Sequence, residues 1–135
     1  MKKIMLLALF AGTLCGCVSV NQRALDSGTS QLATRNYQTK SFDTSDSDNV
    51  IRNIVSTMQD LGFIIDKADK DLGTVSGFSF NSKTNMTVTV RQKGKQCLVR
   101  ANAEYNNKAI TEPVAYQNFF NALAQSLFLA ANDVL

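Results

Sequence analysis

Two segments in which apolar and polar residues strictly alternate constrain the fold more than any other feature of the chain. In the first, Met86, Val88 and Val90 alternate with Thr87, Thr89 and Arg91. After the polar turn 92–95 a second segment, 97–105, repeats the alternation. A period of two predicts β-strands with one buried and one solvent-exposed face. The short turn joins them as an antiparallel hairpin whose apolar face other elements must cover.

Further β-forming segments lie before this hairpin. Residues 63–67 and 74–80 are apolar or β-branched stretches separated by the polar turn 68–73, and residues 81–85 form another turn. We therefore expect four consecutive antiparallel strands joined by short loops. Residues 37–42 also contain β-forming side chains and predict an additional strand at the start of the domain.

Helical periodicity appears on both sides of the strands. A stripe of one 3.6-residue period predicts a helix that is capped by the Asp/Ser/Thr run 43–48 and ends at Gly62. Thr111-Glu112-Pro113 opens a second helix, because proline is favoured in a first helical turn. The stripe of the first helix comprises Val50, Ile51, Ile54, Val55, Met58 and Leu61. The seam of the second comprises Tyr116, Phe120, Leu123, Leu127, Ala130 and Val134, widened by Phe119, Ala124, Phe128 and Ala131.

These elements define the expected fold class, α+β, in the order β-α-β-β-β-β-α. A four- to five-stranded antiparallel sheet carries both helices on one face, since their wide apolar stripes must be buried. Residues 35–135 are expected to form this single domain.

The N-terminus has the pattern of an export signal with a lipid attachment site. Lys2 and Lys3 precede an apolar run at residues 4–11, which is shorter than the about 20 residues that cross a bilayer. Leu14-Cys15-Gly16-Cys17 resembles the bacterial lipobox. That resemblance implies acylation of the Cys17 thiol and cleavage between Gly16 and Cys17. Cys15 is the competing candidate, but it would place the bulky Leu14 next to the cleavage site.

This interpretation divides the chain into a lipoprotein signal peptide (1–16), a lipidated Cys17 with a flexible tether (17–34) and the domain. The seventeen tether residues 18–34 span roughly 20–25 Å as a flexible coil; the alternative is that part of this segment, residues 21–32, forms a short helix. Val18 and Ser19 follow Cys17, so the aspartate that retains enteric lipoproteins in the inner membrane is absent. The resemblance therefore implies an outer-membrane anchor with the domain in the periplasm.

Composition argues against several classes of function. Without Lys2 and Lys3 the mature chain has 12 basic and 11 acidic residues, and no strongly basic patch predicts nucleic-acid binding. Arg91, Lys93 and Lys95 are expected at a solvated hairpin tip. Cys97 is left as a lone thiol and is expected to be buried. The chain has no histidine, which removes the commonest general base and metal ligand.

The carboxylates and hydroxyls also favour structural roles. Asp43, Asp46 and Asp48 lack the glycine and terminal glutamate of a calcium loop. Aspartates near the first hairpin are ordinary turn formers: Asp60, Asp66, Asp69 and Asp71. Ser76 and Thr87 lie in no nucleophile motif. We therefore expect no enzyme, with no catalytic, metal or cofactor-binding residues and no cofactor.

Several stretches resemble a family of small Gram-negative outer-membrane lipoproteins with a Q-D-L-G-F motif. They are residues 37–43, residues 58–66 with Gln59-Asp60-Leu61-Gly62-Phe63 at their centre, Asp71-Leu72-Gly73, and residues 112–120. The likeness covers roughly residues 35–134. The element order is also similar to the helix-grip domains of the BamC lipoprotein, an accessory of barrel assembly. That second likeness is one of architecture, which does not determine function.

The expected function is a non-enzymatic interaction or accessory module of an envelope protein complex, anchored to the membrane by its acyl chains. Its contact surface would be the uncovered sheet face, where Tyr37 or Phe78 is expected, or an open edge strand. The alternative is a small-ligand or lipid binder with a groove lined by Phe119, Phe120, Phe128 and Met86. A periplasmic inhibitor or immunity protein is a third possibility.

Overall fold

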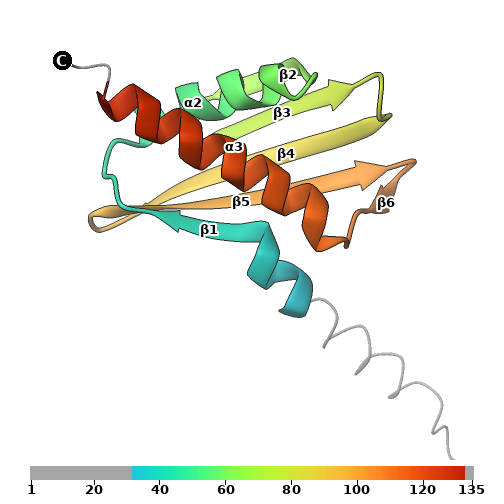
Figure 1. Cartoon of the computed structure of the whole chain (residues 1–135), viewed down its shortest axis with the longest axis horizontal. Helices are drawn as coiled ribbons and strands as arrows, with labels where there is room; N and C mark the ends of the chain where they lie inside the picture. The colour runs from blue at the N-terminus through green and yellow to red at the C-terminus, as the bar shows by residue number, and fades with distance from the viewer. Residues whose placement is uncertain (1–31, 133–135) are drawn as a thin grey trace, which may run out of the picture. The chain divides into compact units, whose positions relative to one another are not determined.

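The sheet is antiparallel, and its strands follow one another along the chain except at one edge. The computed structural model describes residues 32–132. The order across the sheet is β1-β5-β4-β3-β2, with β6 also pairing with β5 (Figure 1). The strands are β1 (Thr39–Phe42), β2 (Ile64–Asp69), β3 (Thr74–Ser79), β4 (Thr84–Lys93), β5 (Gln96–Tyr105) and β6 (Lys108–Ala109).

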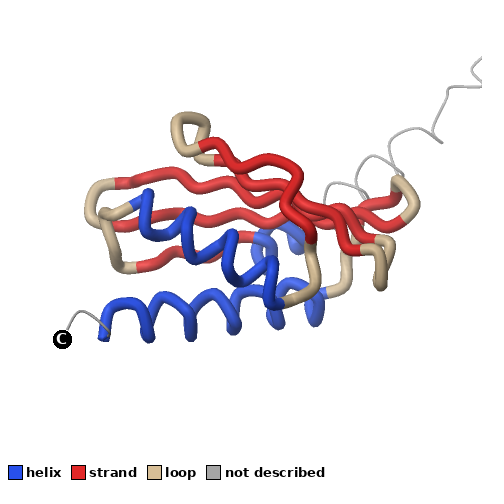
Figure 2. The backbone as a smooth tube through the Cα atoms, turned by 90° about the horizontal axis from the view of Figure 1, so that it is seen from above, coloured by secondary structure: helices blue, strands red, loops and turns tan. Residues whose placement is uncertain are grey.

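Both long helices lie on the same face of this sheet, which confirms the predicted α+β architecture (Figure 2). They are α2 (Ser47–Asp60) and α3 (Pro113–Asn132). The chain leaves β1 at one edge and passes through α2 to β2 at the other. The strands β2 to β5 then return as a simple meander, as the alternation predicts.

The ends of α2 follow from its sequence. The Asp46 carboxylate accepts a hydrogen bond of 3.0 Å from the Asn49 backbone N–H and caps the first turn. At the other end Gly62 adopts a φ of 87°. The Gly62 N–H then donates to the Gln59 carbonyl and the Phe63 N–H to the Met58 carbonyl. This double closure is a Schellman motif, which glycine permits at little cost.

The core lies between the helices and the inner face of the sheet. The alternate residues of β4 and β5 that the sequence places on one face are buried there. The apolar stripes of α2 and α3 pack against these strand residues. The largest fully buried side chains are Tyr116, Phe119, Ile54, Met58, Leu123, Val50, Val75, Val88, Val99 and Cys97.

One polar contact joins α3 to α2, and a second within α2 holds the Asn53 side chain in place. The Ser126 hydroxyl donates to the Asn53 side-chain oxygen at 2.7 Å. The Asn53 amide nitrogen in turn donates to the Asn49 carbonyl at 2.8 Å. Because Asn53 is buried, these bonds satisfy a group that would otherwise destabilise the interface.

Two short elements differ from the sequence prediction. Residues 32–38 are helical, so the strand expected from residue 37 begins at Thr39, and the tether boundary drawn at residue 34 falls inside this helical segment. The second is β6, which follows a two-residue turn. Asn106 and Asn107 there have φ values of 49° and 61°, the backbone of a tight hairpin in which asparagine is favoured.

The Tyr116 hydroxyl explains why the chain changes conformation at residue 38. Gln38 and the Ala103 backbone N–H both donate to this hydroxyl, at 3.0 Å and 3.2 Å. The hydroxyl donates to the Ile110 carbonyl at 2.6 Å. It therefore fills the gap on the edge of β5 between β1 and β6, where strand pairing is interrupted.

Candidate interaction surface

The sheet face that the helices leave uncovered is a surface that the sequence predicts as a contact site. We call it the open face. Strand register places its residues in rows across the sheet. The two middle rows are polar. They include Arg100 on β5 and Lys67 and Asp69 on β2, and their other side chains are short. These rows contain Thr39, Thr74, Thr89, Ser76, Thr87 and Asn102.

One end of the open face is apolar. Ile64 is paired with Phe78 in the register of β2 and β3. Phe80 lies just beyond β3, and its ring packs edge-to-face on Phe78 with 4.9 Å between ring centroids. Ile64 is 59% exposed and Phe80 is 69% exposed. We call Ile64, Phe78 and Phe80 the aromatic end.

A hollow of about 430 Å³ adjoins the aromatic end. It is lined by the three apolar side chains together with hydroxyl, amide and carboxylate groups from Ser76, Thr87, Asn85 and Asp66. Large apolar groups beside a few polar ones are typical of surfaces that receive a partner side chain.

The opposite end of the open face is basic. Arg91 on β4 pairs with Leu98, and Arg100 on β5 pairs with Thr89 two residues along, so the arginines are diagonal neighbours. Both are exposed. Arg100 donates to the Thr39 hydroxyl at 3.4 Å. Among the described residues neither arginine has a carboxylate within ion-pair distance. We call Arg91 and Arg100 the basic end.

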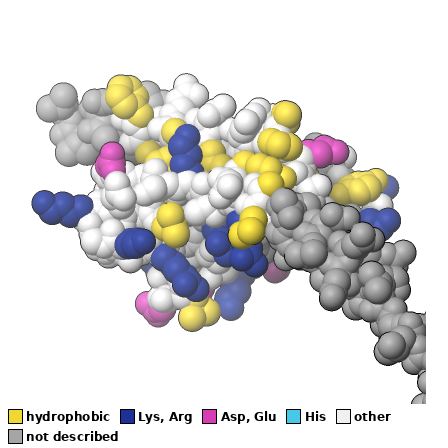
Figure 3. Space-filling model, turned by 90° about the horizontal axis from the view of Figure 1, so that it is seen from below, with side chains coloured by type: hydrophobic (Ala, Val, Ile, Leu, Met, Phe, Trp, Pro, Cys, Tyr) yellow, Lys and Arg dark blue, Asp and Glu magenta, His cyan; other side chains and the backbone are white. Residues whose placement is uncertain are grey.

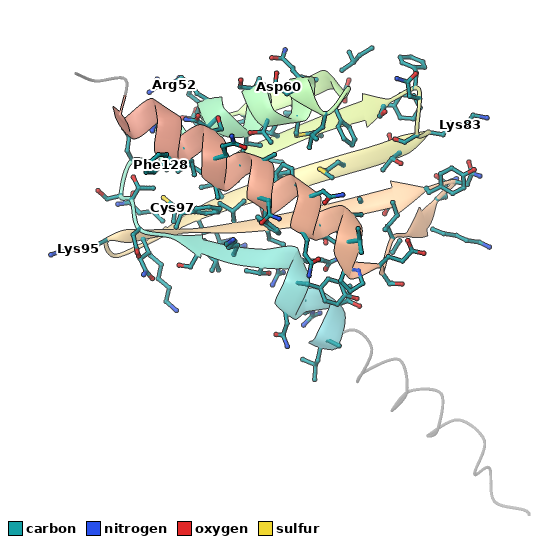
Figure 4. The ribbon with its side chains drawn as sticks, viewed as in Figure 1. Arg52, Asp60, Lys83, Lys95, Cys97 and Phe128 are labelled. Atoms are coloured by element: carbon teal, nitrogen blue, oxygen red, sulfur yellow. The ribbon has the colours of Figure 1, made fainter. Side chains whose placement is uncertain are left out.

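The hairpin between β4 and β5 extends this positive charge. Lys93 and Lys95 lie there and are exposed, as the sequence predicts. Figure 4 shows Lys95 and Lys83 at opposite ends of the sheet, on the basic and the aromatic side respectively. Figure 3 views the molecule from below Figure 1, at the β1 edge of the sheet, and Lys and Arg predominate among the charged side chains on that side.

Two of the aspartates weighed in the sequence, Asp69 of the first hairpin and Asp43 of the capping run, have structural partners. Asp69 accepts from the Leu72 backbone N–H at 2.9 Å and lies 4.0 Å from the Lys67 ammonium. Asp43 accepts from the Gln96 amide at 2.7 Å. No group of three or more potential metal ligands occurs among the residues the structure describes.

Cys97 is buried and free, as predicted. Burial raises the pKa of its thiol above the ordinary value, and the Asp46 carboxylate contributes to the rise. The protonated thiol packs in the core as a small apolar group.

Of the two aromatic residues expected on the contact surface, Phe78 lies on the open face and Tyr37 does not. The Tyr37 ring is 6.0 Å from that of Tyr116 and packs against the core. Its hydroxyl contacts the Thr111 carbonyl. Tyr37 therefore attaches the helical segment 32–38 to the start of α3.

The residues proposed for a ligand groove differ in their exposure. Phe119, Phe120 and Met86 are at most 5% exposed and belong to the core, whereas Phe128 is 68% exposed. A separate hollow of about 480 Å³ lies between β6 and the start of α3, lined in part by Tyr105, Ile110 and Ala115. No sequence pattern singled out this hollow, because its residues meet only through the β6 turn.

The predicted cleavage and lipidation residues Gly16 and Cys17, and the competing Cys15, lie outside the described residues. Within the described part of the chain no helix is long and apolar enough to cross a membrane. Comparison with protein-family models gives no match, and neither does comparison with curated proteins.

Proposed function

We propose that the protein is a periplasm-facing outer-membrane lipoprotein that acts as a non-enzymatic interaction module of an envelope protein complex. The observation that carries the interaction role is the open face. Its exposed Ile64 and Phe80 adjoin a hollow at one end, and its arginines have no ion-pair partner among the described residues at the other. Exposed apolar groups beside polar ones mark protein interaction sites.

The anchoring role rests on the sequence of the N-terminus. Lys2 and Lys3, the apolar run 4–11 and the lipobox ending at Cys17 follow one another in the order that lipoprotein processing requires. Two or three acyl chains, each contributing about 0.8 kcal/mol per buried CH₂, hold a protein stably at a membrane.

Metabolic labelling of the full-length protein with a radioactive fatty acid tests the anchor. Cys17→Ala is expected to lose the label and to leave the membrane fraction, while Cys15→Ala is the matched control and retains both. Label that persists in Cys17→Ala would contradict the assignment of this residue.

Crosslinking in living cells tests the interaction role. The anchored protein is expected to give a reproducible crosslinked species that contains a second envelope protein. If the protein is recovered only by itself at every crosslinker length, it does not act as an interaction module.

A further inference from the structure

We infer that the open face binds a protein partner that presents an apolar side chain to the aromatic end and a cluster of acidic side chains to the basic end. This inference rests on the proposed interaction role and specifies the chemistry of the partner. The two ends are separated along β4 by the distance from Asn85 to Arg91. Six residues of strand correspond to about 20 Å.

The basic end requires an acidic counterpart. Arg91 and Arg100 project from neighbouring strands of the same face, and the described residues offer neither of them an ion pair. A planar guanidinium binds carboxylates through two parallel hydrogen bonds, which gives geometric specificity as well as charge attraction. Lys93 and Lys95 in the adjoining hairpin strengthen the positive potential and accelerate the approach of an acidic surface.

The aromatic end requires an apolar group. Phe78 and Phe80 are held edge-to-face beside Ile64, so two rings and one aliphatic side chain flank the hollow. A hollow of about 430 Å³ has room for one large side chain of a partner. Side chains that fill such hollows dominate the energy of protein interfaces.

Acidic side chains on the open face, one beside each of its two ends, favour a protein over an anionic membrane surface. Glu104 lies in the row of Phe78 and Asn85, and Asp69 lies in the row of Arg100. A uniformly negative lipid surface would repel both carboxylates, whereas a protein can place its own charges to match. The short Thr, Ser and Asn side chains between the two ends can form hydrogen bonds with the backbone of a polypeptide partner.

Zero-length crosslinking of the full-length protein in cells, with a carbodiimide that joins amines to carboxylates, tests this inference. Arg91→Lys and Arg100→Lys retain the charge and introduce a reactive amine at each position. Each is expected to become joined to Asp or Glu of the partner already captured with wild-type protein. Arg52→Lys is the matched control, because Arg52 is exposed on α2 in the helix layer (Figure 4), and it is expected to give no such link.

Charge reversal and truncation test the energetic roles of the two ends. Arg91→Glu with Arg100→Glu is expected to lower the yield of the crosslinked complex about tenfold or more, since it replaces attraction by repulsion. Arg52→Glu with Lys108→Glu makes the same change in net charge on the helix side of the sheet and is expected to preserve the yield. Phe80→Ser is expected to reduce the yield about tenfold, whereas Val114→Ser, at the 63% exposed Val114 of α3, leaves it unchanged.

The outcomes separate this inference from the proposed function. A complex that forms at wild-type yield without carboxylate links, or that survives charge reversal, retains the interaction role and overturns the assignment to the open face. A crosslinked species that contains only a second copy of this chain also overturns it. So does a complex whose formation depends on anionic lipid. Failure to capture any second protein overturns the interaction role itself.

Discussion

At the scale of single residues, the Tyr116 hydroxyl takes part in three hydrogen bonds to separate segments of the chain. It joins the helical segment 32–38, the edge of β5 and the loop before α3. Tyr116 is fully buried. Removal of the hydroxyl would therefore leave several polar groups without a partner in a place that water does not reach.

Tyr116→Phe is expected to lower the free energy of unfolding by about 2–4 kcal/mol, because each unsatisfied buried group costs about 1–3 kcal/mol. Denaturant titration measures the change. Tyr105→Phe serves as the control, since Tyr105 is 48% exposed, and it is expected to change stability by less than about 0.5 kcal/mol. Equal effects of the two substitutions would show that the Tyr116 hydroxyl is not structurally important.

Cys97 gives a pH-dependent prediction. Its buried thiol has a pKa above the ordinary value of 9.0. Above pH 9 the unfolded chain therefore loses this proton while the folded chain keeps it, and the stability contribution present below pH 9 is lost as pH rises. The slope is at most about 1.4 kcal/mol per pH unit. Cys97→Ala is expected to flatten the curve of stability against pH in this range, and parallel curves for the two proteins would contradict it.

At the scale of elements, turns determine how closely the strands approach. Gly73 has a φ of 64°, and a Cβ added there would lie 2.4 Å from the Val90 carbonyl oxygen. The Val90 N–H also donates to the Gly73 carbonyl at 2.7 Å. This turn therefore requires glycine both for its backbone conformation and for the lack of a side chain.

Gly73→Ala is expected to lower the free energy of unfolding by about 1–3 kcal/mol more than Gly94→Ala does. Gly94 has a nearly identical φ of 63°, but nothing lies within 4 Å of an added Cβ. In both variants a residue with a side chain adopts the left-handed conformation, which costs about 1–2 kcal/mol. Only in Gly73→Ala does the added Cβ also overlap the Val90 carbonyl oxygen. Thermal unfolding of the two variants side by side measures the difference, and equal melting temperatures would contradict this interpretation.

The sequence was sufficient to predict α2, α3 and the β4–β5 hairpin, because each has an apolar period that local rules can detect. Residues 37 and 38 show where such rules fail. Their β-forming side chains predict a strand, but Gln38 and Tyr37 adopt a helical turn that lets them reach Tyr116 and Thr111. Contacts between residues more than 70 positions apart decide that conformation, and local propensity does not contain them.

At the scale of the whole molecule, the alternation of apolar and polar residues in β4 and β5 predicts that one face of the sheet is exposed to solvent. This alternation does not predict that the exposed face has an apolar region at one end and a basic region at the other. Arg91 and Arg100 come together, and Ile64 meets Phe78, only through the register of neighbouring strands. The edge-to-face contact of Phe80 with Phe78 likewise depends on the turn after β3. The sequence was therefore sufficient to predict which face of the sheet is exposed. The positions of the aromatic end and the basic end on that face could be identified only from the three-dimensional structure.

The central claim is that the open face is the side of the protein that contacts its partner. The most direct measurement places the photoreactive residue p-benzoylphenylalanine at Phe80, and in a matched strain at Val114, in the full-length protein in living cells. Phe80 and Val114 are 69% and 63% exposed on opposite sides of the sheet. Light is expected to join a second envelope protein to position 80 and not to position 114. Crosslinking at position 114 with none at position 80 would contradict it.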